Sequence, residues 1–345
     1  MPDRAYGWLQ RVWYGDALGG VVLVPLSWLF AAVVALRSAL YRTGILRSHA
    51  VGRPVVVVGN ISVGGTGKTP LTIALAERLA AHGLRAGVAS RGYAGAGGEA
   101  RIVHAGSEAA DVGDEPLLIA QSGHALVAVS ADRVAAARLL VEQGCDVIVA
   151  DDGLQHLRLQ RDVEVVVVDG ERGLGNRRLL PAGPLREPPA RLETVDMVVV
   201  NGGASADLLP GLADPRRTIG MVLEATEAVA LVRGGGARSL SDFSGQRVHA
   251  LAAIGNPGRF FTLLRRHGID PVEHPLADHA PLDAQSIRFD DDLPVLMTEK
   301  DAVKCRAVAD RRHWAVRVAP VFAGNGLERL ERLVLERVAR KGARP

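Results

Sequence analysis

One short segment limits what this chain can fold into more than any other. A run of valines, Val55–Val58, leads through Gly59 and Asn60 into Ser62-Val63-Gly64-Gly65-Thr66-Gly67-Lys68-Thr69, and a helical pattern follows. A buried strand, a glycine-rich turn and a helix in this order are typical of a P-loop, whose backbone N–H groups surround phosphate oxygens. The segment therefore predicts a nucleotide site, and the helix N-terminus adds its positive dipole.

Two residues of this segment have separate expected roles. The ammonium group of Lys68 would neutralise β- and γ-phosphate charge, and the hydroxyl of Thr69 would hold Mg²⁺. The segment departs from the usual pattern at Ser62, where a P-loop normally has glycine. Because Ser62 is small and two glycines follow, we keep this prediction over the alternative, an ordinary glycine-rich turn between strand and helix.

Two adjacent carboxylates follow a second apolar run. Val147–Ala150 is followed directly by Asp151 and Asp152. An acid at the carboxyl end of such a strand is in position to bind Mg²⁺ directly or through water. Neighbouring carboxylates cannot both be buried and charged without a cation close by. The alternative is a helix-capping aspartate beside a solvated one.

Other candidates carry weak signals on their own. The acidic pair Asp114-Glu115 precedes a proline, so a helix cap explains it better than catalysis does. Arg186-Glu187 follows a proline-rich stretch typical of an ordered loop, and a lone His279 is usually structural. The stretch Thr298–Asp301 lacks the spacing of a guanine-reading element, which favours ATP over GTP.

Short valine-rich runs recur between residues 55 and 200, with helical patterns between them. Apolar runs in which polar residues do not alternate with apolar ones are typical of strands buried on both faces of a parallel sheet. We therefore predict an α/β fold, a P-loop NTPase-like three-layer sandwich with a mostly parallel sheet. The predicted strands are Val55–Val58, Arg85–Ala89, Asp146–Ala150, Glu164–Val168 and Asp196–Val200, and the helices between them include Leu71–His82 and Arg133–Gln143.

Glycine-rich breaks divide the rest of the chain. Ala94–Gly113 is expected to be a mobile loop, and further breaks come at Gly202–Arg217 and Arg233–Gly236. Two more strands and the amphipathic stretch Leu327–Ala339 follow. The expected division is an N-terminal hydrophobic helical segment at residues 1–50, a P-loop core at 51–222 and a smaller C-terminal α/β domain with a terminal helix at 223–345.

The N-terminal segment contains twenty consecutive uncharged residues, Ala17–Leu36, with arginines on both sides. As one helix they would span about 30 Å, close to the thickness of a bilayer core. Pro25 is expected to break the middle of this helix, and two glycines weaken its start. A hairpin of helices lying in the membrane surface or partly inserted fits these breaks better than a spanning helix. A buried core helix is the remaining alternative, and a cleaved signal peptide fits poorly.

The composition of the chain limits the classes of partner and the cellular compartment that we expect. The net charge of +3 arises from 41 basic and 38 acidic residues without a block of one sign, so a nucleic-acid partner is not expected. Two cysteines far apart cannot form a disulfide framework and indicate a reducing compartment. Lysine is scarce: Lys68, Lys300, Lys304 and Lys341 are the only four.

Taken in order, these motifs closely resemble the tetraacyldisaccharide 4′-kinase family of the lipid A pathway in Gram-negative bacteria. The similarity runs from the hydrophobic stretch to about Cys305. The segments that carry it are Ser62–Thr69, Ser90–Tyr93, Gly113–Pro116, Asp151–His156, Leu180–Glu187, Ile254–Pro257 with Arg259–Phe261, Ala277–His279 and Thr298–Lys304.

The resemblance implies transfer of the ATP γ-phosphate to the 4′-hydroxyl of a tetraacylated glucosamine disaccharide 1-phosphate. It also implies work at the cytoplasmic face of the bacterial inner membrane, as a peripheral or monotopic protein with an acylated lipid substrate. The alternative is a membrane-associated P-loop ATPase without a lipid acceptor. The sequence identifies no protein partner.

The resemblance further assigns site residues by position. Asp151, Asp152 and Glu115 resemble the acids around Mg²⁺, together with Thr69. Asp114 resembles the base for the sugar hydroxyl, and His279 resembles its partner across the domain cleft. Active-site roles are also implied for Arg186, Glu187 and Arg133, the last as a charge stabiliser.

Overall fold

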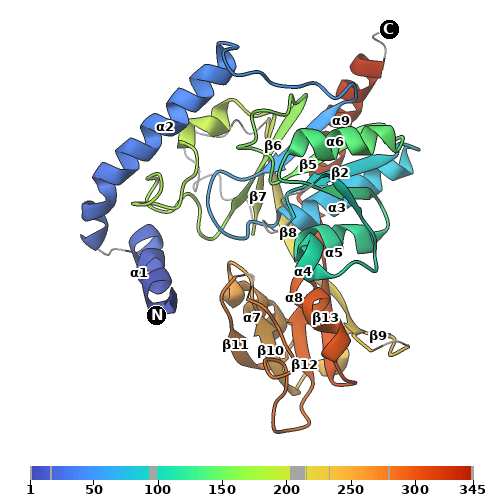
Figure 1. Ribbon diagram of the computed structural model, residues 1–345. Coiled ribbons are helices and arrows are strands. Elements are labelled where there is room, and N and C mark those ends of the chain that lie inside the picture. Colours follow the sequence, from blue (N-terminus) through green and yellow to red (C-terminus); the bar gives the residue numbers. More distant parts are fainter. Residues whose placement is uncertain are drawn as a thin grey trace.

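One mixed β-sheet passes through both halves of the protein (Figure 1). The computed structural model describes residues 2–15, 18–92, 99–202, 214, 216–232, 234–278 and 280–342. The strands of these residues are β1 (Val55–Gly59), β2 (Ala86–Ser90), β3 (Arg101–Val103), β4 (Leu126–Val129), β5 (Val147–Asp151), β6 (Val163–Asp169), β7 (Met197–Asn201), β8 (Thr218–Ala230), β9 (Ala237–Arg238), β10 (Arg247–Ala252), β11 (Asp270–Pro275), β12 (Val295–Thr298) and β13 (His313–Phe322). Their order across the sheet is β11-β10-β12-β13-β8-β7-β6-β1-β5-β2-β4-β3, and β9 pairs with β8.

Helices cover both faces of this sheet. The α-helices of the described residues are α1 (Pro2–Tyr14), α2 (Val24–Arg42), α3 (Lys68–Ala81), α4 (Ala109–Val112), α5 (Asp114–Ser122), α6 (Arg133–Glu142), α7 (Pro257–Arg266), α8 (Glu299–Cys305) and α9 (Gly326–Gly342). Short 3₁₀ turns lie at η1 (Leu18–Leu23), η2 (Pro189–Glu193), η4 (Leu240–Phe243) and η5 (Arg306–Val308).

The strands of the P-loop half are parallel from β4 to β8, and only β3 at the edge runs the other way. Every residue of β1, β2, β5 and β7 is buried, which explains why these runs are apolar without alternation. Val58 lies opposite Asp151, and Asp169 lies opposite Asn201. The carboxyl ends of these strands therefore bring their polar residues to one edge of the sheet.

Alternate residues of β1 show why the fold has three layers. Val56 and Val58 pack in the apolar cluster that contains residues of α3, α5 and α9, whereas Val55 and Val57 pack in the cluster that contains residues of α6. Successive side chains of a strand point to opposite faces, so each face of the sheet requires its own helical layer. The predicted three-layer sandwich with a mostly parallel sheet is confirmed.

Two long strands join the halves of the molecule. β8 runs parallel to β7 and antiparallel to β13, from Met221 opposite Phe322 to Ala230 opposite Trp314. The boundary expected between residues 222 and 223 lies inside β8, so the chain crosses between the halves within a strand. The division into domains stays a prediction.

The C-terminal half repeats the layered construction on a smaller scale. β11, β10, β12 and β13 are parallel. Phe260, Phe261 and Leu264 of α7 pack on one face, and Ala302 and Cys305 of α8 pack on the other. α9 returns to the P-loop half, where Glu331 pairs with Arg78 at 2.6 Å. The amphipathic pattern of α9 thus reflects packing on α3, whereas the sequence places this helix with the C-terminal domain.

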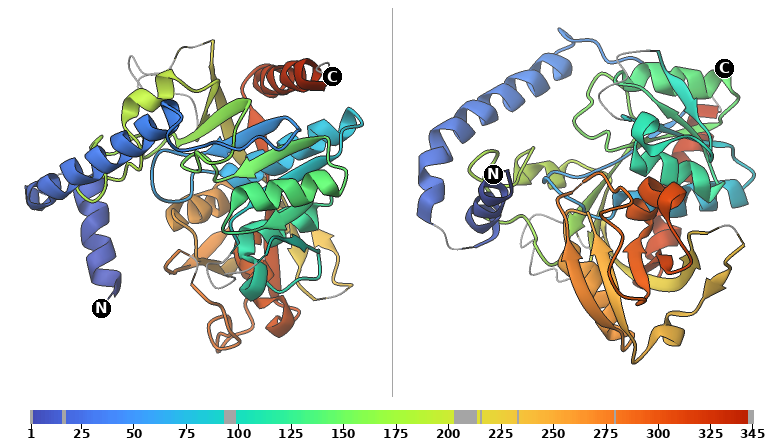
Figure 2. Two further views of the ribbon diagram at one scale, coloured as in Figure 1. Left: turned by 45° about the horizontal axis from the view of Figure 1, so that its top comes forward. Right: turned by 60° about the horizontal axis from the view of Figure 1, so that its bottom comes forward.

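The N-terminal segment forms two helices that stand away from the body of the protein (Figure 2). Contrary to expectation, Pro25 lies in the first turn of α2 and does not interrupt it. Proline is compatible with that position because the first turn leaves its N–H groups unpaired. Ser27 Oγ donates to Leu179 O at 2.6 Å, and Trp13 Nε1 donates to Pro181 O at 2.9 Å. These bonds anchor both helices to the loop before Arg186.

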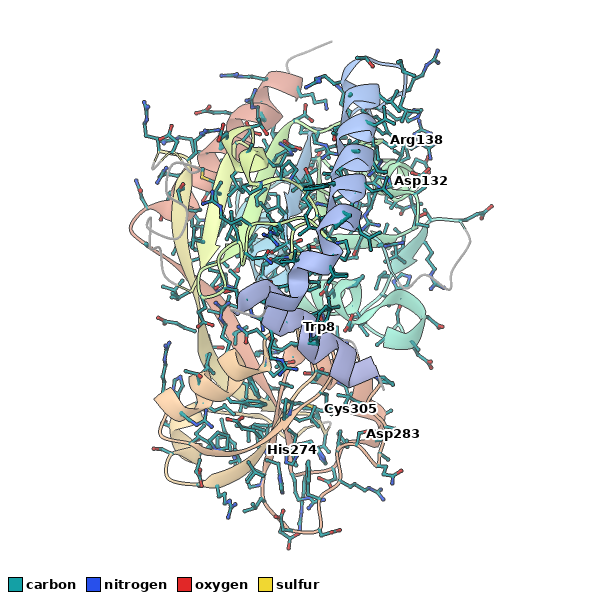
Figure 3. The ribbon with its side chains drawn as sticks, turned by 90° about the vertical axis from the view of Figure 1, so that its left-hand side faces the viewer. Trp8, Asp132, Arg138, His274, Asp283 and Cys305 are labelled. Carbon is teal, nitrogen blue, oxygen red and sulfur yellow. The ribbon has the colours of Figure 1, made fainter. Side chains whose placement is uncertain are left out.

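The span Gly20–Arg42 is long and apolar enough to cross a membrane, but only 11% of its most apolar window is buried. Figure 3 shows α2 along the outside of the P-loop half, with Trp8 on α1 near its lower end. The alternative of a core helix therefore fails, because a core helix would be mostly buried. The exposed large side chains of this segment include Val21, Val22, Leu26, Trp28, Leu29, Val33 and Leu36.

Candidate active site

The P-loop turn connects the carboxyl end of β1 to α3, which begins at Lys68. Gly64 and Gly67 have φ values of 104° and 94°, in the left-handed region. A Cβ atom at Gly67 would lie 2.4 Å from Nδ2 of Asn201, so this position needs glycine for both space and backbone conformation. The glycine pattern of the sequence therefore follows from the geometry of the turn.

The two ends of the P-loop segment have different surroundings. Gly65–Thr69 line a cavity of about 370 Å³ between the halves of the molecule, here called the cleft cavity. Ser62 forms a β-bridge with Leu185, and the N–H of Val63 donates to Pro184 O at 2.8 Å. The serine that replaces the usual glycine thus lies against the Leu180–Glu187 loop.

Asp151 is buried at the carboxyl end of β5. Its Oδ1 accepts a long hydrogen bond from Thr72 at 3.4 Å, and its buried Oδ2 has no hydrogen-bond partner among the described residues. Burial, and then the charge of Glu115, raise the pKa of Asp151 to about 7 against the opposing charge of Lys68. Such a carboxylate is poorly stabilised as an anion until a cation approaches it.

Asp152 follows with a left-handed backbone, at φ 49°. Its carboxylate lies 3.5 Å from Lys68 Nζ and 3.2 Å from Arg186 Nη1. Burial opposes its ionisation, but the charges of Lys68 and Arg186 hold the pKa of Asp152 below its usual range. A non-glycine residue with this backbone is unfavourable and persists where its surroundings hold it, often at functional sites.

These donors fit Mg²⁺. In the part of the chain that the structure describes, no three or more His, Cys, Asp or Glu side chains are arranged to hold a metal ion by themselves. Mg²⁺ in nucleotide sites typically uses one or two carboxylates and completes its shell with water and phosphate oxygens. The unpaired Oδ2 of Asp151, with Thr69 and Glu115 on the wall of the cleft cavity, supplies that kind of set.

Arg133 is the first residue of α6 and is buried behind β5. Its guanidinium donates to Ser130 O at 3.2 Å and to the backbone oxygen of Asp151 at 3.4 Å. Burial lowers the pKa of Arg133 to about 10, although Asp151 and Asp152 oppose this shift. Its positive charge therefore lies at the end of β5, on the face of the sheet that α6 covers.

The second acidic pair lies at the start of α5. Asp114 is 3% exposed, and its Oδ1 accepts from the N–H of Glu115 at 3.0 Å, so it does not cap the helix as its position suggested. Lys300 Nζ lies 2.9 Å from Glu115 Oε1, and Lys304 Nζ lies 3.8 Å from Asp114 Oδ2. Both lysines come from α8 in the other half. His279 lies outside the described residues.

The Leu180–Glu187 loop connects this site to the N-terminal helices. Glu187 accepts hydrogen bonds from Gln155 at 2.6 Å and from Arg191 at 3.0 Å. Arg186 pairs with Asp152 and also lines a second cavity of about 370 Å³, here called the α2 cavity. The α2 cavity is also lined by Phe30, Val33, Val34 and Arg37 of α2. Arg186 thus lies between the P-loop acids and the exposed hydrophobic helix.

The contacts that hold the two halves together are not indicated by the sequence. Arg259 of α7 donates to Asp169 Oδ1 at 2.9 Å, and Arg172 donates to the backbone oxygen of Gly255 at 2.8 Å. A Cβ atom at Gly255 would lie 2.4 Å from the backbone nitrogen of Gly65. The segments Ile254–Pro257 and Arg259–Phe261 are among those that carry the family resemblance, but nothing in the sequence indicates that they contact the P-loop half.

Comparisons with known proteins agree with this geometry. The sequence model described as Tetraacyldisaccharide-1-P 4′-kinase matches residues 20–339. A tetraacyldisaccharide 4′-kinase of Xanthomonas axonopodis pv. citri is 51% identical over 310 residues, 88% of this chain and 89% of that protein. One of Alkalilimnicola ehrlichii is 49% identical over 340 residues, 96% of each. A crystal structure of "apo" form LpxK from Aquifex aeolicus in complex with ATP is similar with a TM-score of 0.76 and 27% identity, covering 93% of this chain and 100% of that chain.

Proposed function

This chain belongs to the tetraacyldisaccharide 4′-kinase family, and we propose that Gly65–Thr69 present the γ-phosphate of ATP to the 4′-hydroxyl of a tetraacylated glucosamine disaccharide 1-phosphate. The protein is an ATP-dependent kinase of lipid A biosynthesis that uses ATP and Mg²⁺. The observation that carries the proposal is the 3.5 Å approach of Lys68 to Asp152, because it places a phosphate-binding cation at the start of α3 beside an acid of the proposed metal site at the end of β5.

The assignment of the charged groups follows from where they lie. Thr69, Asp151, Asp152 and Glu115 would hold Mg²⁺, which supplies positive charge to the phosphate oxygens when bound. Lys68 binds the β- and γ-phosphates from the first turn of α3. Arg133 stabilises the negative charge at the end of β5 from behind, through the backbone oxygen of Asp151.

Asp114 is the proposed base. It accepts the proton of the 4′-hydroxyl while that oxygen bonds to the γ-phosphorus, and the bond from the γ-phosphorus to the bridging oxygen of ADP breaks. Its position at the start of α5, next to Glu115 and facing α8, supports this role. The family resemblance supports His279 as its partner and Arg186 and Glu187 as residues on the acceptor side.

The membrane supplies the lipid acceptor in this proposal. The protein works at the cytoplasmic face of the inner membrane, where ATP is present, as a peripheral or monotopic protein. The exposed apolar side chains of α2 support attachment to lipid, and the α2 cavity beside Arg186 supports delivery of the sugar from that side. The relatives' names do not favour a P-loop ATPase without a lipid acceptor.

Transfer of radiolabelled phosphate from ATP to the disaccharide lipid tests the proposal. The wild type should form a labelled lipid, and ATP consumption should depend on the acceptor. Lys68→Ala should form at least about a hundredfold less product, since it removes a cation from the transition state. ATP consumption that is the same with and without the lipid would instead support the ATPase.

A further inference from the structure

Lysine is rare in this chain, and its four residues are unevenly placed. Lys341 on α9 pairs with Asp162 at 2.7 Å, directly before β6 and thus at the opposite end of that strand from the carboxyl end that carries Asp169. Lys68 belongs to the P-loop. Lys300 and Lys304 both come from α8, and both reach the acidic pair of α5 in the opposite half. The proposed function explains Lys68 but gives no role to the lysines of α8.

The local structure of α8 fixes where these two lysines point. Thr298 caps the helix by accepting from the N–H of Asp301, and Asp301 is completely buried. The carboxylate of Asp301 also accepts from the N–H of Ala253 at 3.0 Å, next to the segment that touches the P-loop. Because residues four apart share one face of a helix, Lys300 and Lys304 project together toward α5.

Each lysine bridges the two halves. Lys300 Nζ lies 2.9 Å from Glu115 Oε1 and 3.3 Å from Asp278 Oδ1. Lys304 Nζ lies 3.8 Å from Asp114 Oδ2 and donates to the backbone oxygen of Ala280 at 3.3 Å. Asp278 and Ala280 are the chain neighbours of His279. The two ammonium groups therefore contact the acids at the start of α5, which include the proposed base Asp114. They also contact the chain neighbours on both sides of its proposed partner, His279.

The pairing is electrostatically strong because the lysines are shielded from water. The carboxylates of Glu115, Asp278 and Asp114 lie within 4.0 Å of Lys300 Nζ. Lys300 and Lys304 side chains are 16% and 9% exposed. In a chain that otherwise uses arginine, a compact ammonium suits a site where one cation must serve several oxygens at different angles.

We propose that Lys300 and Lys304 are positioning residues that assemble the acceptor side of the active site, by tying Asp114 and Glu115 of one half to Asp278 and Ala280 of the other. This inference rests on the proposed role of Asp114. In this role the lysines act through the carboxylates and the backbone oxygen that they contact. Their loss therefore affects the transfer step more than the binding of ATP.

Kinetics of Lys304→Met, Lys304→Arg, Asp114→Ala and the double variant Asp114→Ala/Lys304→Met test this inference. Lys304→Met should lower kcat by roughly 10- to 100-fold, the loss typical of a misplaced reacting group. The dissociation constant for ATP, measured by equilibrium binding, should change less than about threefold. Lys304→Arg should recover part of the loss. The double variant should be no slower than Asp114→Ala, since both changes disable one unit.

Lys341→Met is the matched control and should keep wild-type kcat, because Lys341 lies outside the site. Thermal unfolding of every variant separates loss of folding from loss of positioning. Wild-type kcat in Lys304→Met, or losses that multiply in the double variant, would overturn the inference. If Asp114→Ala itself keeps normal turnover, the proposed base is wrong, and that failure is distinct from the failure of the lysine bridge.

Discussion

Nζ of Lys68 lies 3.5 Å from Oδ1 of Asp152, so the cation that begins α3 is paired with the residue that follows β5. Asp152 also pairs with Arg186, which reaches the α2 cavity. A single carboxylate therefore connects the phosphate-binding turn to the loop that carries the N-terminal helices.

Replacing the proposed base should separate catalysis from nucleotide binding. Asp114→Ala removes the proton acceptor, and general bases typically contribute about 10²- to 10⁴-fold to rate. We expect kcat to fall within that range while the dissociation constant for ATP stays near its wild-type value. Steady-state transfer assays with equilibrium ATP binding measure both. Near-normal turnover would show that another group accepts the proton.

The P-loop should not tolerate a side chain at Gly67. In Gly67→Ala the new Cβ would meet Asn201 Nδ2, and the left-handed backbone adds strain of about 1–2 kcal/mol. We expect lower thermal stability and loss of ATP binding. Gly83→Ala is the matched control, since Gly83 has φ 74° and nothing within 4 Å of its Cβ position. The control should lose some stability but bind ATP normally; equal ATP binding by both variants would contradict the prediction.

Asp151 should make the protein without nucleotide and metal less stable as pH rises. Its folded pKa of about 7 lies above that of an unfolded aspartate, so its contribution is fully present below about pH 4 and is lost as pH rises through about 7. Asp151→Asn cannot ionise, so at pH 8 it should be more stable than the wild type by on the order of a few kcal/mol.

Thermal unfolding in a chelating buffer at pH 5 and pH 8 measures this difference. The advantage of Asp151→Asn should shrink toward pH 5, where the wild-type carboxyl is already protonated. The variant should also lose phosphate transfer, because its amide cannot replace the carboxylate at the metal. An equal stability difference at the two pH values would mean that Asp151 is already ionised in the free protein.

The exposed face of α2 should bind lipid. Trp28 and Leu29 are 70% and 63% exposed, so replacing both with glutamine should leave the folded body intact. Burying one large apolar side chain contributes about 1.5–3 kcal/mol, and losing two should weaken binding to anionic vesicles by more than about tenfold. Vesicle flotation measures this. Val321→Gln, on β13 and 43% exposed, is the control. Unchanged flotation of the α2 variant would contradict membrane attachment through this face.

Much of the nucleotide half could be predicted from the sequence because its signals are local. The valine runs became β1, β5, β6 and β7, and the helix after the P-loop begins at Lys68. Strands such as β4 and β11 were missed because they are short or include polar residues and prolines. Pro25 was misinterpreted, since its effect depends on whether the helix begins before or after it.

The sequence by itself determined the phosphate turn, because the conformational freedom of glycine, the start of a helix and the burial of a valine strand depend on neighbours a few residues away. Only the tertiary structure decided which distant residues complete the site. Lys300 and Glu115 are 185 positions apart and meet because β8 and β13 bring the two halves of the sheet together. Ion pairs between residues so far apart in the chain depend on the topology of the sheet. The sequence around a charged residue does not indicate which strands will bring its partner close.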